Sequence, residues 1–249
     1  MRIDAKGMHY QELNRLIHQA VGGNSKEITL DNVNGQRYIG GGLSGKVKIT
    51  INGVPGNDLA AFMDGPTVVV NSNAQDGIGN TMNAGKIIVH GSAGDIVGHS
   101  MRGGKIFIKG DVGYRVGIHM KAYKELYPVV ITGGSAGDFL GEYMAGGMII
   151  VLGLSAAEGG NSDSQPIVGN YIGTGMHGGA IFIRGIIQDY QLGREVKAEG
   201  LDKENLGEIE AYLKEYCDEF SLDFDRLVKK KFFKLSPHST RPYGRLYAY

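Results

Sequence analysis

Short runs of alternating apolar and polar residues recur along the chain, and β-branched side chains are common in them. Period-two alternation bounded by glycine is typical of short strands that bury one face. Helices are therefore not the repeating element of this chain. The predicted strands are Val47–Ile51, Thr67–Val70, Lys86–Val89, Lys105–Ile108, Val129–Thr132, Met148–Leu152 and Ala180–Ile183.

These strands belong to a repeat of 19 residues with the form G-x-x-M-x-x-G-x-I-x-V-x-G, in which Leu43 marks the first unit. Insertions near Lys121–Tyr127 and at Ser155–Pro166 lengthen single units without changing the phase. Each unit is too short for a strand, a crossover helix and two loops, but it suffices for one coil of a solenoid. The columns consist of Met63, Met82, Met101, Met120, Met144 and Met176; of Gly79, Gly98, Gly117, Gly141 and Gly173; and of Gly85, Gly104, Gly147 and Gly179.

The repeat predicts an all-β solenoid, namely a single-stranded right-handed parallel β-helix of about seven coils. Equivalent positions of successive coils would stack about 4.8 Å apart. The methionines are expected inside, where a flexible thioether fills irregular gaps, and the glycines at bends that need positive φ or close backbone approach. Parallel crossover connections favour the right-handed winding.

Helical spacing is confined to the two ends of the chain. It predicts a short N-terminal helix over Tyr10–Ala20 and a C-terminal helix over Asp202–Phe220, with Asp202 as N-cap. A basic, aromatic tail at 229–249 follows and is expected to dock. We therefore divide the chain into an N-terminal helix and lead-in cap (1–35), a β-helix (36–190), and a C-terminal helix with a docking tail (191–249).

Composition narrows the class of partner. The chain has 26 basic and 26 acidic residues among 249, so no long-range field favours nucleic acid or an anionic membrane. No apolar run reaches the length of a membrane span, and the N-terminus has no apolar signal core. With Cys217 as the single cysteine, these features predict a cytoplasmic protein. The chain has 41 glycines but only 6 prolines, which does not fit the composition of a linker or of collagen. The repeat accounts for the glycines instead.

No motif predicts catalysis, a cofactor or a metal on this chain. The segment Gly40–Lys46 fits a phosphate loop, but Val47 replaces the required Ser or Thr and a strand follows. His99, His119 and His177 do not share a column, which argues against a metal site. One column of the repeat consists mainly of polar residues. We favour exposed turns, in which such side chains bond nearby backbone amides, over a row of catalytic carboxylates. The members of this column are Asp76, Asp95, Tyr114, Asp138 and Asn170.

Three segments carry a family resemblance: Gly133–Gly137 (GGSAG), Gly141–Gly153 (GEYMAGGMIIVLG) and Gly173–Ala180 (GTGMHGGA). Together with the lead-in Asn34–Gly45, they resemble the glycine-repeat (GXGXG) domain at the C-terminal end of the glutamate synthase large subunit. The resemblance covers about Ile28 to Ile187. It is specific as a set, although each motif alone is weak.

The resemblance implies a right-handed β-helix in an enzyme that transfers glutamine-derived ammonia to 2-oxoglutarate and reduces the product to glutamate. In the family, an N-terminal cysteine hydrolyses glutamine, and reduction occurs on an FMN barrel beside an iron–sulfur cluster. Here Arg2 follows Met1 and no barrel-length segment exists. The chain therefore resembles a stand-alone subunit of archaeal or bacterial type that performs no catalysis alone. FMN and the iron–sulfur cluster are expected on partners, an FMN-dependent glutamate synthase subunit and a glutaminase (amidotransferase) subunit, and a homo-oligomer is left open.

Two alternatives stay open. One component of the molybdenum or tungsten formylmethanofuran dehydrogenases shares the fold and the repeat. The segment Glu142–Met144 and the helical end favour the synthase. The other alternative is an independent enzyme that uses a solenoid face, as parallel β-helix carbohydrate enzymes do.

Overall fold

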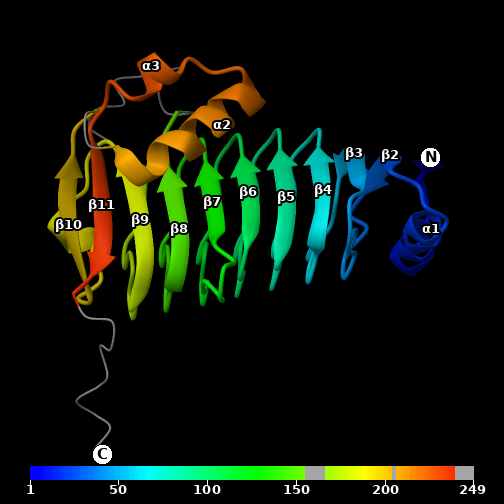
Figure 1. Ribbon diagram of the computed structural model, residues 1–249, viewed down its shortest axis with the longest axis horizontal. Helices are drawn as coiled ribbons and strands as arrows, with labels where there is room; N and C mark the ends of the chain where they lie inside the picture. The colour runs from blue at the N-terminus through cyan, green and yellow to red at the C-terminus, as the bar shows by residue number, and fades with distance from the viewer. Residues whose placement is uncertain (155–165, 204–205, 239–249) are drawn as a thin grey trace, which may run out of the picture.

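The computed structural model describes residues 1–154, 166–203 and 206–238. These residues form a parallel β-solenoid of about six turns, in which each turn contributes one strand to a single sheet. The sheet has 11 strands in the order β1-β2-β3-β4-β5-β6-β7-β8-β9-β11-β10. Figure 1 shows the strands side by side along the longest axis of the molecule.

The seven strands predicted from alternation are all present, and they follow β1 (Arg2–Asp4) and β2 (Glu27–Asn34). From β1 to β9, each strand pairs in parallel with the next. Because about six turns join the seven predicted strands, the predicted count of about seven coils was slightly too high. The predicted strands correspond to β3 (Lys48–Val54), β4 (Asp64–Val70), β5 (Ala84–Val89), β6 (Gly104–Ile108), β7 (Pro128–Thr132), β8 (Ala145–Val151) and β9 (Gly178–Arg184).

The interior is one continuous apolar cluster that runs the length of the solenoid. Every second strand residue points inward, so the register stacks equivalent side chains directly over one another. One such column is Ile49, Val68, Ile87, Ile106, Val130, Ile149 and Ile181. The methionines of the repeat come at the turn before a strand, as Met63 does before β4. All six are 0% exposed: Met63, Met82, Met101, Met120, Met144 and Met176.

The outer face of the sheet is covered in its C-terminal half by α2 (Glu210–Phe220), which lies across β6–β9 (Figure 1). The buried Tyr216 hydroxyl donates to the carbonyl oxygen of Ile108 at 2.8 Å and so fixes the helix to β6. A second apolar cluster fills the space between helix and sheet. The short helix α3 (Phe224–Leu227) follows.

The C-terminal helix begins later than the sequence predicts. The predicted N-cap, Asp202, directly follows β10 (Val196–Leu201), and a 3-10 turn at Gly207–Ile209 precedes the helix. Gly207 has φ +41°, which interrupts a helical path from Asp202. The spacing of apolar residues therefore predicted the buried face of α2 correctly, but it placed the start of the helix too early in the chain.

Both ends of the sheet carry additional elements. At the N-terminal end, α1 (Tyr10–Gly22) buries Leu13 and Ile17 in the solenoid interior, as its spacing predicted. At the other end, β11 (Phe232–Pro237) pairs antiparallel with β9, and β10 pairs antiparallel with β11. A further 3-10 turn spans Asp189–Gln191.

The two strands β10 and β11 were not predicted, because both lie outside the 19-residue repeat. The segment around β11 is basic and aromatic, and β10 is a short run just before the predicted helix start at Asp202. Part of the predicted tail, 239–249, and most of the insertion at Ser155–Pro166 lie outside the described residues. The division of the chain at residues 36 and 190 stays a prediction.

We expect Met101→Asp to lower the free energy of unfolding by on the order of 4 kcal/mol or more, because it places a charge inside the continuous apolar interior. Thermal melting followed by circular dichroism measures the effect. Arg102→Asp is the matched control, since Arg102 is the exposed neighbour of the fully buried Met101. Similar melting of the two variants would contradict the inward placement of this column.

Candidate functional site

The predicted repeat glycines occupy bends of the backbone. The glycine that begins each G-x-x-M turn has positive φ, and its carbonyl accepts from the methionine N–H, as from Met101 to Gly98 at 3.1 Å. The second glycine column also has positive φ, and at Gly104 an added Cβ would lie 2.8 Å from the carbonyl oxygen of Gly85. The φ values are +67°, +71°, +71°, +68° and +68° at Gly79, Gly98, Gly117, Gly141 and Gly173, and +105°, +84°, +93° and +82° at Gly85, Gly104, Gly147 and Gly179.

The predicted polar column is a ladder between coils. The Asp76 carboxylate accepts from the backbone N–H of Asp95 at 2.9 Å, and the Asp95 carboxylate accepts from the N–H of Tyr114 at 2.8 Å. Asp138 accepts from Asn170 in the same way at 2.7 Å. The side chains therefore bond the equivalent backbone position one coil later, rather than an amide in their own turn. Carboxylates used in this way stabilise the stack.

A parallel ladder runs three residues earlier in each coil and was missed by the sequence reading. Asn73 accepts from the N–H of Ser92 at 2.9 Å, Ser92 Oγ accepts from the N–H of Asp111 at 3.0 Å, and Asp111 accepts from the N–H of Ser135 at 2.7 Å. The signal was a fixed column of short acceptor side chains one repeat apart. These residues join successive coils at the corner that follows each strand.

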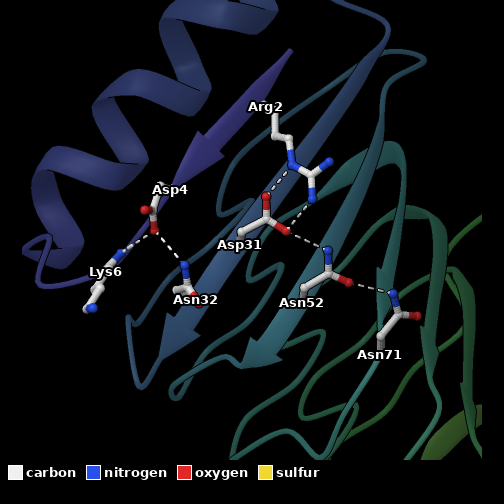
Figure 2. A network of polar contacts seen from close by, with 7 residues as sticks. All are labelled: Arg2, Asp4, Lys6, Asp31, Asn32, Asn52 and Asn71. Atoms are coloured by element: carbon white, nitrogen blue, oxygen red, sulfur yellow. Dashed lines mark hydrogen bonds and ion pairs between the residues drawn. The ribbon is translucent and has the colours of Figure 1, made fainter.

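A third polar row crosses the first strands on the outer face of the sheet (Figure 2). Arg2 pairs with Asp31, whose carboxylate accepts from Asn52 Nδ2 at 2.8 Å, and Asn71 Nδ2 donates to Asn52 Oδ1 at 2.8 Å. The hydrogen bonds from Arg2 and then Asn52 lower the pKa of the Asp31 carboxyl. This network joins β1, at the edge of the sheet, to the strands beside it. The charges of Arg2 and Asp31 therefore stabilise the edge of the sheet.

The G-x-x-M turns form a different surface, the aromatic–histidine face, which we define as Tyr38, Phe62, His99, His119, Phe139, Tyr143 and Tyr171. The His99 and His119 rings lie 6.2 Å apart between centroids, and His119 stacks on Tyr143 at 5.4 Å. Phe139 stacks on Tyr171 at 4.9 Å. Phe62 is 60% exposed and Tyr171 is 55% exposed, so the face presents aromatic rings to solvent.

Charged and amide groups line the same face. Asn80 Nδ2 donates to the Asp58 carboxylate at 3.1 Å, and a His99 ring nitrogen lies 3.2 Å from Asn80 Oδ1. Farther along, Arg115 Nε lies 3.4 Å from the largely buried Glu142 carboxylate. The arrangement gives a row of alternating rings and polar groups across successive coils, which suits a macromolecular contact.

A cavity of about 380 Å³ lies where this face meets α1. Asn14 and His18 of α1 line one side, and Tyr38, Asp58 and Phe62 line the other. His18 Nε2 lies 3.2 Å from the Gly41 carbonyl oxygen, and Asn14 Nδ2 donates to the Arg37 carbonyl at 2.9 Å. These bonds hold α1 on the first coil and fix the shape of the cavity.

The histidines of this face are adjacent although they occupy different columns. Their columns differ by one residue, and the stacking of coils brings the His99 and His119 rings together. Partial burial is the main cause that lowers the pKa of His99, and the nearby His119 adds to it, while Asp58 opposes it. Within the described part of the chain, no three His, Cys, Asp or Glu side chains are grouped as metal ligands.

Cys217 is buried between α2 and the sheet, and burial raises the pKa of its thiol to about 11. A thiol with a raised pKa is a poor nucleophile at neutral pH. The segment that resembled a phosphate loop, Gly40–Lys46, leads into the strand β3 and not into a helix, as the sequence predicted. Of the helices in the described residues, none is long and apolar enough to cross a membrane.

The sequence reading missed the aromatic–histidine face. A signal for it exists in the column just before each methionine, where three of the six residues carry rings, Phe62, His119 and Tyr143. The backbone at these positions has positive φ, 59° at Phe62, 55° at His119 and 52° at Tyr143. Left-handed backbone at bulky residues is uncommon, so the repeat imposes it.

We expect Gly98→Val to lower the free energy of unfolding by about 2–4 kcal/mol, from left-handed strain and overpacking. Gly98 has φ +71°, and an added Cβ would lie 3.1 Å from Val130 Cγ2. Gly22→Val is the control, because Gly22 ends α1 with open space around it. Equal losses in chemical denaturation would argue against the repeat frame.

We expect His119→Ala to raise the pKa of His99 and leave it below the usual 6.5, because the like charge is removed while burial stays. Stability from the lowered pKa of His99 is complete above 6.5 and is lost as the pH falls through the folded pKa. NMR titration of the His99 ring measures the shift. His9→Ala, at the N-cap of α1, is the control and should leave His99 unchanged.

The sequence model of a family described as "GXGXG motif" matches residues 17–240. A Methanocaldococcus jannaschii protein, "Uncharacterized protein MJ1350", is 52% identical over 251 residues, which cover 98% of this chain and 95% of that protein.

Among solved structures, a chain of the formyltransferase/hydrolase complex (FhcABCD) from Methylorubrum extorquens, solved in complex with methylofuran, has a similar fold. The TM-score is 0.63 at 20% identity, with 86% of this chain and 74% of that chain covered. At this identity the likeness shows the fold alone. The match over residues 17–240 confirms the resemblance drawn from the glycine-repeat segments, and the chain belongs to the GXGXG motif family.

Proposed function

We propose that the chain is a non-catalytic structural subunit of a glutamate synthase, which forms glutamate from glutamine and 2-oxoglutarate. It scaffolds a separate FMN-dependent synthase subunit and a separate glutaminase subunit. The observation that carries the proposal is the GXGXG match over residues 17–240, which joins the segment-by-segment resemblance to the synthase domain.

The use of the polar side chains supports this proposal. Asp76, Asp95 and Asp138 bond backbone amides of the next coil. Cys217 is buried with a raised pKa and so lacks the properties of a glutaminase nucleophile. We accordingly place FMN and the iron–sulfur cluster on the partner subunits.

A second candidate is a component of a formylmethanofuran dehydrogenase. The fold likeness to a chain of the FhcABCD complex favours it, since that protein is a formyltransferase/hydrolase assembly of several subunits. Both candidates give the chain the same physical role, which is to hold partner subunits in place.

Reconstitution tests the first candidate. The chain is co-expressed with the FMN-dependent synthase subunit and the glutaminase subunit of its own genome, and complex formation is followed by size-exclusion chromatography. We expect a ternary complex that forms glutamate from glutamine and 2-oxoglutarate, while the purified chain is colourless and inactive. Met101→Asp should abolish assembly and Arg102→Asp should preserve it.

Three results would contradict the proposal. The first is full coupling of glutamine hydrolysis to glutamate formation without this chain. The second is co-purification from the native organism with molybdopterin-containing subunits, which would establish the second candidate. The third is hydrolase or lyase turnover by the purified chain alone, which would make it an independent β-helix enzyme.

A further inference from the structure

The outer face of the sheet is only half covered. Helix α2 lies over β6–β9 and its C-terminal residues reach β5, whereas β3 and β4 carry no helix. On these uncovered strands there is a groove of about 550 Å³, the lysine groove. Its lining includes Lys26, Lys46, Lys48, Val69 and Lys86, and it ends at Glu219, near the C-terminus of α2.

Helix α2 shows how an acidic helix packs on this face. Lys86 Nζ lies 2.7 Å from the Glu219 carboxylate and 3.3 Å from Glu215, and Lys105 pairs with Glu215. Burial alone would raise the pKa of Glu215, but the hydrogen bond and charge of Lys105, with Lys86, outweigh burial and lower it. The apolar side of the helix meanwhile packs on the strands.

The same lysine column continues beyond the helix. The register places Lys48 of β3, Thr67 of β4, Lys86 of β5 and Lys105 of β6 in one row across the sheet. Lys86 and Lys105 are paired with α2. Over the described residues, Lys46 and Lys48 have no carboxylate within ion-pair distance and are exposed.

The groove therefore continues the two rows that lie beneath α2, the lysine row as far as Lys48 and the apolar row as far as Val69. Glu27 is the one carboxylate in the described lining besides Glu219, against Lys26, Lys46 and Lys48. Val69 continues the apolar surface, since it packs at the margin of the helix–sheet cluster. The C-terminal segment 239–249 contains Arg241 and Arg245 and no acidic residue, so its charge does not complement the groove.

We propose that the lysine groove binds an acidic amphipathic helix of a partner protein, which continues the line of α2 across β5, β4 and β3. Carboxylates on one flank of that helix pair with Lys46 and Lys48, and its apolar stripe packs on Val69. The inference takes from the proposed function only that partners assemble on this chain. It holds for either parent complex.

The test uses the full chain and a labelled peptide, so it does not depend on reconstitution of the synthase. The probe is a helix-forming peptide of about 16 residues with a leucine stripe flanked by glutamates at i and i+4. The comparison peptide has lysine in place of each glutamate. Fluorescence anisotropy should show binding of the acidic peptide, weakened by salt, and no binding of the basic one.

The variant Lys46→Glu/Lys48→Glu should bind the acidic peptide about tenfold more weakly, since two attractive contacts become repulsive. The variant Lys121→Glu/Lys124→Glu is the matched control, because these lysines do not line the groove. It should bind as the unmodified chain does. Carbodiimide crosslinking, followed by mass spectrometry, should join the peptide to Lys46 or Lys48.

Several results would overturn the proposal. Equal binding of both peptides, equal weakening in both double variants, or crosslinks mainly outside the groove would each do so. A double-stranded oligonucleotide that binds the groove lysines more tightly than the acidic peptide would identify a polyanion site instead. A dimer of the chain that dissociates only in Lys46→Glu/Lys48→Glu would identify a second copy as the occupant.

Discussion

The whole structure depends on the stacking of equivalent backbone positions in successive coils. Parallel strands lie about 4.8 Å apart, so a side chain that differs in size or direction from its column disturbs both neighbours. The interior columns satisfy this constraint with isoleucine and valine on the strands and with methionine at the turns before them, all buried. Glycine at the bends is the other half of the constraint, because the backbone there has positive φ or approaches the previous coil too closely for a Cβ.

The same constraint explains where the acidic and hydroxyl side chains lie. A coil leaves backbone N–H groups at its corners, and an adjacent coil presents a short side chain to each of them. Asp76, Asp95 and Asp138 accept such bonds one coil later, so their apparent similarity to a row of catalytic carboxylates follows from the repeat. The hydrogen bonds of these carboxylates therefore hold successive coils together.

Most of the solenoid could be predicted from the sequence because its periodicity is local. The strands, the buried methionines, the positive φ of the repeat glycines and the helix at Tyr10 all follow from spacing. The strands β10 and β11 could not be predicted, since they lie outside the repeat and depend on antiparallel pairing, β11 with β9 and β10 with β11. The contact between His99 and His119 was also missed, because comparison within single columns overlooks neighbours on adjacent columns.

In a solenoid, packing constrains the columns of side chains that point inward, whereas the columns that point outward are free to serve function. At 20% identity the chain has a fold similar to that of a chain from a formyltransferase/hydrolase complex, so different sequences can satisfy the constraints of the interior and the bends. Identity of the parent enzyme must then reside in the outward columns. In this chain those columns form two unlike surfaces, the aromatic–histidine face on the turns and the lysine groove on the sheet. The two partners proposed for this chain would need two such surfaces, and the lysine groove lies on the sheet, so it can vary without any change to the core.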